Sequence, residues 1–205
     1  CVGQCRETLE KEGFEILTFH ASGKGGMTME QMIDDGYISA VLDITTTEWS
    51  DELKGGILTA GPTRLEAPGN AGIPHLIVPG CIDMVNFGPP ETVPEEYKKR
   101  NLYQSKPTTT LMRTTEEENK ELGKIFAEKA NANKGNNAFL IPMKGFSMLD
   151  TEGEPFWLPE ADTAFIDTLK EHLDKDIPVI EIDAHINDTE FSNKAASMLL
   201  EMIRR

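Results

Sequence analysis

The sequence predicts an α/β protein with a Rossmann-like fold, in which a mostly parallel sheet carries helices on both faces. Short runs of nearly continuous apolar residues recur along the chain, as is typical of strands buried on both faces of a parallel sheet. Stretches with helical spacing of apolar residues separate these runs, and this alternation favours a parallel sheet. The chain has 205 residues, which is enough for one such domain.

Each predicted strand is a short run rich in apolar residues, bounded by polar or turn-forming residues. The predicted strands are residues 15–19, 39–44, 75–78, 138–142 and 179–182. Apolar stripes predict helices at residues 2–12, 29–36, 122–130, 161–169 and 191–203. Thr115 and Glu118 have the spacing of a capping box at the start of the third of these helices. Residues 86–106 contain three prolines and are predicted to form a long functional loop.

The chain begins with a helical pattern, in which Val2, Cys5 and Leu9 share one face and Gly13 is a stop signal. In an alternating β/α chain, a helix at the start implies a preceding strand. We therefore expect residues 1–205 to be a single domain that lacks its first strand and is the C-terminal half of a longer two-domain protein. The resulting sheet edge invites pairing, so we also expect a homo-oligomer.

Composition restricts the class of partner. The net charge of −15 disfavours nucleic acid and anionic membranes. No apolar run approaches the ~20 residues of a membrane span, and no secretory signal is visible in these 205 residues. Three cysteines are too few for a disulfide framework, so a cytoplasmic location is expected.

One loop indicates an anion site. The sequence His-Ala-Ser-Gly-Lys-Gly-Gly, residues 20–26, joins a predicted strand to a predicted helix. The first N–H groups of a helix lack internal partners, glycines allow close approach of a ligand, and a lysine adds charge. The predicted anion contacts are therefore Ser22, Gly23, Lys24, Gly25 and Gly26, although a merely flexible connection would have the same composition.

Further candidates follow from the position of the strand ends, because ligands of open parallel sheets bind beyond the carboxyl ends of the strands. Hydroxyl, amide and charged residues follow each predicted strand, and two further candidate regions are the turn of Gly61 and Arg64 before a short helix and the helix start at Arg113. Cations among these residues are candidate counter-charges for phosphate. These candidates are Thr45, Thr46, Thr47, Gly61, Arg64, Gly80, Asp83, Asn86, Arg113, Lys144 and Ser147. The threonines have an alternative interpretation as helix-capping residues.

A second hypothesis is general acid–base catalysis on a small carboxylate or carbonyl metabolite. His20, Asp83 and His185 are the candidate acids and bases, with Arg113 as the clamp for a carboxylate. Structural roles are the alternative for each histidine. Asp183, His185 and Asp188 are close enough in sequence to form a metal site, but no further nitrogen or sulfur ligand accompanies them. No metal is therefore predicted.

Six sequence blocks, in one order, resemble a bacterial and plant family named for the tomato mosaic virus resistance protein. They are FHASGKGG, LDITTTE, AGPTRL, the segment from Pro79-Gly80 to Asn86-Phe87-Gly88, TLMRT and Phe156-Trp157. The resemblance covers the chain from Cys1 to its last helix. It implies a Tm-one-like domain that binds ATP, in the C-terminal half of a longer protein. It also implies, from the plant member, a protein-interaction module.

The chain departs from the family pattern at three places. Ser22 and Lys24 replace threonines of the glycine loop, which keeps one hydroxyl and adds one charge. Ser105 and Lys106 stand where the family tends to have His-Asn, and Cys81 replaces a small residue. The leading hypothesis is therefore binding of ATP or another phosphorylated small molecule, with catalysis and protein interaction as the two alternatives.

Overall fold

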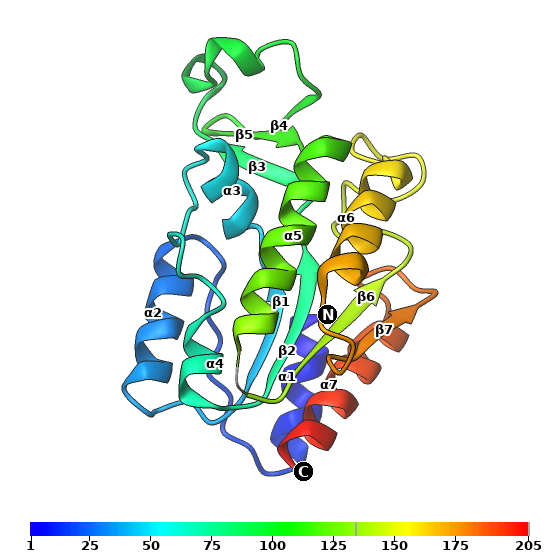
Figure 1. The fold of residues 1–205 in the computed structure, drawn as a ribbon. Coiled ribbons are helices and arrows are strands. Elements are labelled where there is room, and N and C mark those ends of the chain that lie inside the picture. Colours follow the sequence, from blue (N-terminus) through cyan, green and yellow to red (C-terminus); the bar gives the residue numbers. More distant parts are fainter. Residues whose placement is uncertain (134, 205) are drawn as a thin grey trace.

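The computed structural model describes residues 1–133 and 135–204 and confirms the α/β, Rossmann-like class (Figure 1). Its parallel sheet has the strand order β1-β2-β6-β7. These strands are β1 (Val41–Thr45), β2 (His75–Gly80), β6 (Asn137–Pro142) and β7 (Val179–Ile182). All four were predicted with bounds close to those observed, because continuous apolar runs identify strands that are covered on both faces.

Helices cover both faces of this sheet, as predicted (Figure 1). Leu76 and Val78 of β2 pack in a core cluster with α1 and α7, whereas Ile77 between them packs in a cluster with α3, α5 and α6. Val41 of β1 packs on the same side as Ile77, against α2 and α4. The helices are α1 (Val2–Lys11), α2 (Lys24–Asp34), α3 (Glu48–Lys54), α4 (Ala67–Ala71), α5 (Glu116–Ala132), α6 (Pro159–His172) and α7 (Thr189–Ile203).

Local signals account for two helix ends. The predicted capping box is present at α5, where the Thr115 side chain accepts from the Glu118 N–H and the Glu118 side chain accepts from the Thr115 N–H. After α1, Gly13 adopts a φ of 91°, a left-handed conformation that glycine takes without steric cost. The chain therefore turns directly from α1 into residues 14–21.

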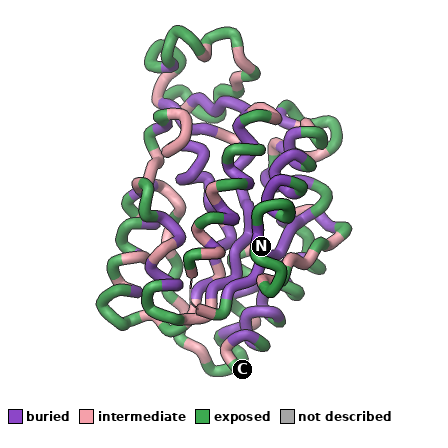
Figure 2. Tube along the Cα trace, viewed as in Figure 1, coloured by how far each residue is buried: buried purple, intermediate pink, exposed green. Residues whose placement is uncertain are grey.

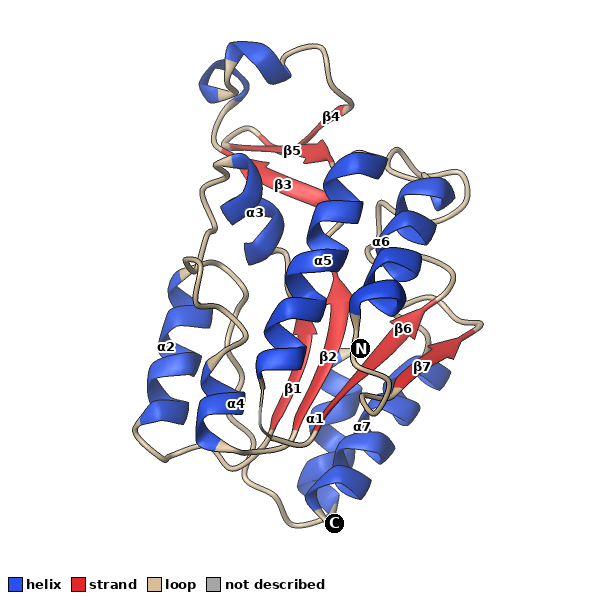
Figure 3. Cartoon of the chain, viewed as in Figure 1, coloured by secondary structure: helices blue, strands red, loops and turns tan. Residues whose placement is uncertain are grey.

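The prediction of a loop at residues 86–106 was wrong at both ends, although residues 88–101 lie outside any strand or α-helix. This region contains the end of β3 (Met84–Phe87), the short 3-10 turns η1 (Pro90–Thr92) and η2 (Glu95–Tyr97), and β4 (Leu102–Lys106). β3, β5 (Thr109–Arg113) and β4 form an antiparallel sheet in the order β3-β5-β4, beyond the carboxyl ends of β1 and β2 (Figure 3). β4 is largely exposed, so it lacks the apolar run by which buried strands are recognised.

The prediction of a strand at residues 15–19 was also wrong. The segment is assigned to no helix or strand, although its Phe14 and Ile16 pack on the cluster of α1 and α7 and its Phe19 on the cluster of α2. Its apolar pattern is that of a strand, but a strand assignment requires backbone partners, which the segment lacks within the described chain.

Burial is concentrated in the parallel sheet and the inner faces of its helices, whereas the region from η1 to β4 is largely exposed (Figure 2). None of the helices described has the length and apolar character needed to cross a bilayer. The carboxyl ends of β1 and β2 therefore meet a polar region between the parallel sheet and the antiparallel sheet, where many of the sequence-predicted site residues lie.

Candidate functional site

The glycine loop contacts a carboxylate of its own chain. The N–H groups of Gly23 and Gly26 both donate to Oε1 of Glu48, at 2.8 and 3.1 Å. Glu48 is the first residue of α3 and is only 1% exposed. The N-terminus of α2 thus holds an anionic group, as its unpaired N–H groups favour, and that group is an internal side chain.

Arg64 neutralises this carboxylate and joins it to β1. Its Nε donates to Oε2 of Glu48 at 2.7 Å, and its terminal nitrogens donate to both oxygens of Asp43 at 2.6 and 2.7 Å. Glu30 of α2 lies 3.3 Å from the same guanidinium. Burial alone raises the pKa of Asp43, but Arg64 and then His75 lower it more, so this carboxyl stays ionised. Arg64, a predicted counter-charge for a ligand, is therefore committed to internal carboxylates.

Two groups of the loop remain uncommitted among the described residues. The Lys24 side chain is exposed and has no ion-pair or hydrogen-bond partner there, and the N–H of Gly25 likewise has no acceptor. Both belong to the first turn of α2, where the positive end of the helix dipole lies. Within the described residues, the N–H groups of Gly23 and Gly26 thus hold Glu48, whereas the Gly25 N–H and the Lys24 ammonium group bind no acceptor.

Gly25→Ala is expected to destabilise the protein by about 1–3 kcal/mol, as overpacking does. A Cβ at this position would overlap the carbonyl oxygen of His20, which is backbone and has little freedom to move. Gly3→Ala in α1 is the matched control, because a Cβ there meets nothing within 4 Å and should raise stability by about 0.5–1 kcal/mol. Urea unfolding of both variants measures the difference, and equal effects of the same sign would contradict the tight packing of this loop.

The threonines after β1 support neighbouring strands. Thr46 Oγ1 donates to the carbonyl of Val78, and Thr47 Oγ1 donates to the carbonyl of Met84. Neither caps α3 through its side chain, so the capping interpretation was wrong for this helix. The two hydroxyls thus bind backbone oxygens of both sheets, since Val78 belongs to β2 of the parallel sheet and Met84 begins β3 of the antiparallel sheet.

Asn86 is held by the second acidic residue of α3. Its N–H and its side-chain amide donate to the two oxygens of Asp51, at 2.8 and 2.7 Å, and its amide also lies 3.3 Å from Thr47 Oγ1. Burial raises the pKa of Asp51 to about 7, against the opposing effect of the hydrogen bonds from Asn86. Two predicted residues, Thr47 and Asn86, are therefore brought together by a carboxyl group.

A third cluster of buried polar residues, after those around Arg64 and Asp51, surrounds Arg113. Its Nη2 lies 2.7 Å from Oδ1 of Asp162 and 3.4 Å from Oδ1 of Asp150, and its Nη1 donates to the carbonyl of Asp83 at 3.5 Å. Ser147 Oγ donates to Asp83 Oδ2 at 2.7 Å, whereas Asp83 Oδ1 is buried without a partner among the described residues. Burial, followed by repulsion from Asp150, raises the pKa of both Asp83 and Asp162.

Two of the three predicted acid–base residues, Asp83 and His185, contact the same residue, Ser147, but through different groups of it. His185 Nε2 contacts the carbonyl of Ser147 at 2.8 Å, and Ser147 in turn donates to Asp83. His20 instead lies at the edge of the parallel sheet, beside β1, and no hydrogen bond in the described chain links it to Asp83 or His185. The geometry therefore gives no shared reacting position for all three.

The remaining predicted residues do not take part in the contacts around Glu48, Asp51 and Arg113, and several of them bind residues close in sequence. Ser22 Oγ donates to the carbonyl of His20, and Gly61 N–H donates to Thr59 Oγ1. Lys144 is exposed and pairs with Asp183 at 3.0 Å. Two more mark strand ends: Thr45 is the half-buried last residue of β1, and Gly80 ends β2, where a Cβ would overlap the carbonyl oxygen of Ile44.

Among the buried acids Asp83 was a candidate, but sequence reasoning did not include five others that bind predicted site residues. They are Asp43, Glu48, Asp51, Asp150 and Asp162. Acidic residues are usually exposed, so a single sequence gives little reason to place them inside. The sequence did contain one signal for two of these buried acids. Glu48 follows directly after three threonines, and Asp51 lies three residues later, so both acids share one face of a helix.

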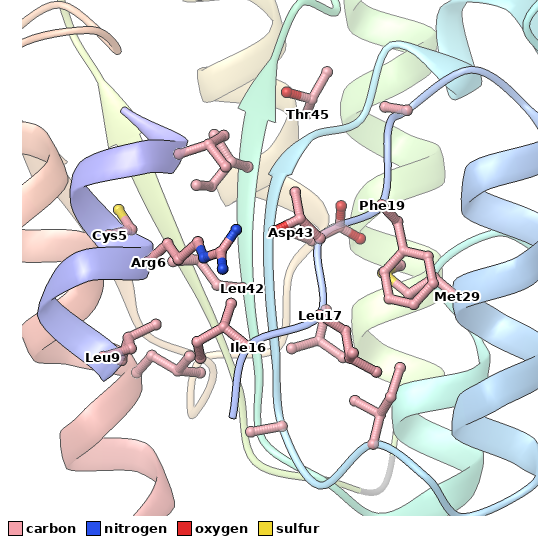
Figure 4. A pocket seen from close by; sticks show the side chains of 18 of the residues that line it. Cys5, Arg6, Leu9, Ile16, Leu17, Phe19, Met29, Leu42, Asp43 and Thr45 are labelled. Atoms are coloured by element: carbon pink, nitrogen blue, oxygen red, sulfur yellow. The ribbon is translucent and has the colours of Figure 1, made fainter. Parts of the chain in front are cut away.

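A cavity of about 530 Å³ adjoins the glycine loop. It lies among α1, residues 14–21 and β1, as Figure 4 shows with side chains from all three. Its lining is polar near His20, Thr45 and Glu48, and apolar near Ile16, Leu17 and the end of α7. The cavity therefore runs from the carboxyl end of β1 along the open edge of that strand.

Residues 1–203 match the family described as "Uncharacterised protein family (UPF0261) C-terminal domain". A UPF0261 protein of Clostridium tetani (strain Massachusetts / E88) is 53% identical over 205 residues, which cover 100% of this chain and 51% of that protein. A UPF0261 protein of Rhizobium meliloti (strain 1021) is 44% identical over 199 residues, covering 96% of this chain and 50% of that protein. The ToMV resistance protein Tm-1(GCR237) of Solanum lycopersicum is 40% identical over 204 residues, covering 98% of this chain and 27% of that protein. The chain thus spans about half the length of the two bacterial relatives and about a quarter of the plant protein.

Proposed function

The chain belongs to the uncharacterised protein family UPF0261, whose C-terminal domain it matches, and we propose that it binds a phosphate-bearing small molecule through its glycine loop. The proposed site lies at the carboxyl edge of the parallel sheet, beside the end of β1. A nucleotide is the first ligand class to test, because the sequence resemblance described above implies ATP binding.

The observation that carries this proposal is the pair of uncommitted donors at the start of α2. The Lys24 ammonium group and the Gly25 N–H have no partner within the described chain, and both lie at the positive end of an 11-residue helix. Backbone N–H groups and a cation at a helix N-terminus favour phosphate oxygens. In a protein with a net charge of −15, this local arrangement supplies the positive potential that an anion requires.

The internal contacts of the loop support binding by holding it in one conformation. Glu48 accepts from the N–H groups of Gly23 and Gly26, and Arg64 holds Glu48 from the other side. A preorganised loop loses less conformational entropy when a ligand binds. Because Gly23 and Gly26 already donate to Glu48, and the Ser22 hydroxyl donates to the His20 carbonyl, fewer groups are proposed to contact phosphate than the sequence predicted: Lys24, the Gly25 N–H and the Thr45 hydroxyl.

Lys24→Ala is expected to weaken the binding of ATP by about fivefold, since one exposed charge contact contributes ~1 kcal/mol. Calorimetric titration of the full-length protein with ATP, ADP and inorganic phosphate measures this change. Lys194→Ala is the matched control, because it removes another exposed lysine, from α7, and lowers the net charge by the same amount. Its affinity should equal that of the unsubstituted protein.

The titration also identifies the part of the ligand that is recognised. Binding of all three compounds would indicate recognition of phosphate alone, and binding of ATP and ADP alone would indicate that the nucleoside contributes. The absence of heat and of a thermal shift with every phosphate compound would overturn the proposal. Equal losses in Lys24→Ala and Lys194→Ala would show that the effect comes from net charge and not from the loop.

A further inference from the structure

The edge of the parallel sheet beside β1 lacks a backbone partner in the described chain. Val41 donates its N–H to the carbonyl of Pro74, on the β2 side, at 2.8 Å. In a parallel ladder, successive residues of a strand point their N–H and C=O groups to opposite sides. The N–H and C=O of Leu42 therefore point away from β2, toward the 530 Å³ cavity.

Residues 15–19 form the opposite wall of this cavity and also lack backbone partners. Neither their N–H groups nor their carbonyl oxygens form a hydrogen bond with the described residues. Their side chains nevertheless contact both layers of the fold, since Ile16 packs toward α7 and Phe19 toward α2. The cavity thus separates two extended segments that each have open hydrogen-bonding groups and strand-like side-chain placement.

The handedness of the crossovers identifies where a further strand belongs. The connection from β6 through α6 to β7 runs away from β1 and places its helix on the face that carries Ile77. α1 lies on the opposite face, against α7. Because β-α-β crossovers are right-handed, a crossover through α1 into residues 15–19 must run in the opposite direction along the sheet. Its first strand therefore lies on the β1 side of residues 15–19, which is the position of the cavity.

We propose that the cavity is the docking slot for a β-strand of the longer polypeptide, connected directly to the start of α1. The strand would lie parallel to β1, between β1 and residues 15–19, and would pair with both. The matched bacterial proteins are about twice as long as this chain, so they contain additional polypeptide from which such a strand can come. This proposal does not depend on the proposed ligand.

The lining of the slot specifies the chemistry of this strand. One face of the slot is formed by Cys5, Leu9 and Leu199, and the other by Phe19 and Met29. A strand with apolar layers on both sides is apolar on both faces. We therefore expect a nearly continuous run of apolar, β-branched residues without proline, because an interior strand must donate its N–H groups to both neighbours.

Hydrogen exchange of the full-length protein tests this proposal directly. The Leu42 amide is expected to exchange at least about a thousandfold more slowly than in an unstructured peptide, as interior strand amides do. Alternate amides of residues 15–19 should be slowed similarly. Gln104 on the exposed edge strand β4 is the internal control: its partner Thr110 donates to Gly88 of β3, so the Gln104 amide points outward and should exchange rapidly.

Light scattering on the same sample assigns the source of the strand. Slow exchange of Leu42 in a monomer would support a strand from the same polypeptide. Slow exchange found only in a dimer would overturn the proposal in favour of a second copy. Exchange at Leu42 as fast as at Gln104 would overturn it outright, whatever the mass. Because the readout contains no phosphate ligand, failure here is distinguishable from failure of the proposed binding function.

Discussion

Replacing Arg64 with methionine is expected to lower the free energy of unfolding by about 3–5 kcal/mol, the cost of removing one partner from a buried ion pair. Arg64 is 3% exposed, and its guanidinium group binds Asp43 through two parallel hydrogen bonds. It also binds Glu48, which is 1% exposed. Without Arg64, two buried carboxylates must either remain unpaired or take up protons.

The effect should extend to the glycine loop. Glu48 holds the N–H groups of Gly23 and Gly26 only while its carboxylate stays in place beside Arg64. The Arg64→Met variant should therefore expose the Gly23 and Gly26 amides to faster hydrogen exchange at temperatures below its melting point. Loss of stability and loss of loop protection have one cause, so they should occur together.

Urea unfolding with a surface control tests this expectation. Arg204 donates to Glu12 at 2.8 Å and its side chain is 64% exposed, so Arg204→Met should cost less than about 1 kcal/mol. Arg64→Lys should be intermediate, because an ammonium group keeps the charge but cannot bind Asp43 through two parallel bonds. If Arg64→Met costs no more than Arg204→Met, the buried carboxylates do not depend on Arg64.

The free energy of unfolding is expected to fall as the pH rises from about 5 to about 8. Burial raises the pKa of Asp51 from 3.8 to about 7, and it also raises the pKa of Asp83 and Asp162. Between the unfolded and folded pKa values, the folded state binds more protons than the unfolded state, so increasing pH favours unfolding. This stabilisation is fully present below pH 3.8 and is lost as the pH passes the raised values. A shift of this size at Asp51 corresponds to roughly 4 kcal/mol, at about 1.4 kcal/mol per pKa unit.

Two buried aspartates should respond in opposite ways to the same substitution. Asp83→Asn should raise stability at about pH 8 and change it little at about pH 5, because Asp83 Oδ1 has no partner in the described chain and its ionised form is disfavoured. Asp43→Asn should lower stability at both pH values, because Arg64 keeps that carboxylate ionised and paired. Urea unfolding at the two pH values measures both effects. A pH-independent loss in Asp83→Asn would contradict the expected protonation.

The sequence by itself determined the class of the fold and most of its parallel sheet. The runs at residues 75–78 and 138–142 become β2 and β6, both fully buried, because continuous hydrophobicity follows from cover on both faces. The capping box of Thr115 and Glu118 determined the start of α5 for an equally local reason, since all its atoms belong to four consecutive residues. Both the apolar run of a buried strand and the capping box of a helix involve only a few consecutive residues. Each can therefore be recognised in the local sequence.

Tertiary structure alone decided which groups are paired. Residues 15–19 have the composition of a strand, yet they lack backbone partners in the described chain, because pairing depends on a neighbour that local composition does not specify. β4 has little apolar character, yet it pairs with β5 at the edge of the antiparallel sheet.

In the candidate site, too, the partner of a polar group is not specified by local sequence. Residue types after the strand ends predicted an anion site, but not that Glu48 would occupy the donors of Gly23 and Gly26, nor that Arg64 would bind Asp43. These contacts join residues that are 21 to 25 positions apart in the chain. The partner of a charged group is set by the packing of helices against the sheet, because burial makes an unpaired charge costly wherever the fold brings it inside.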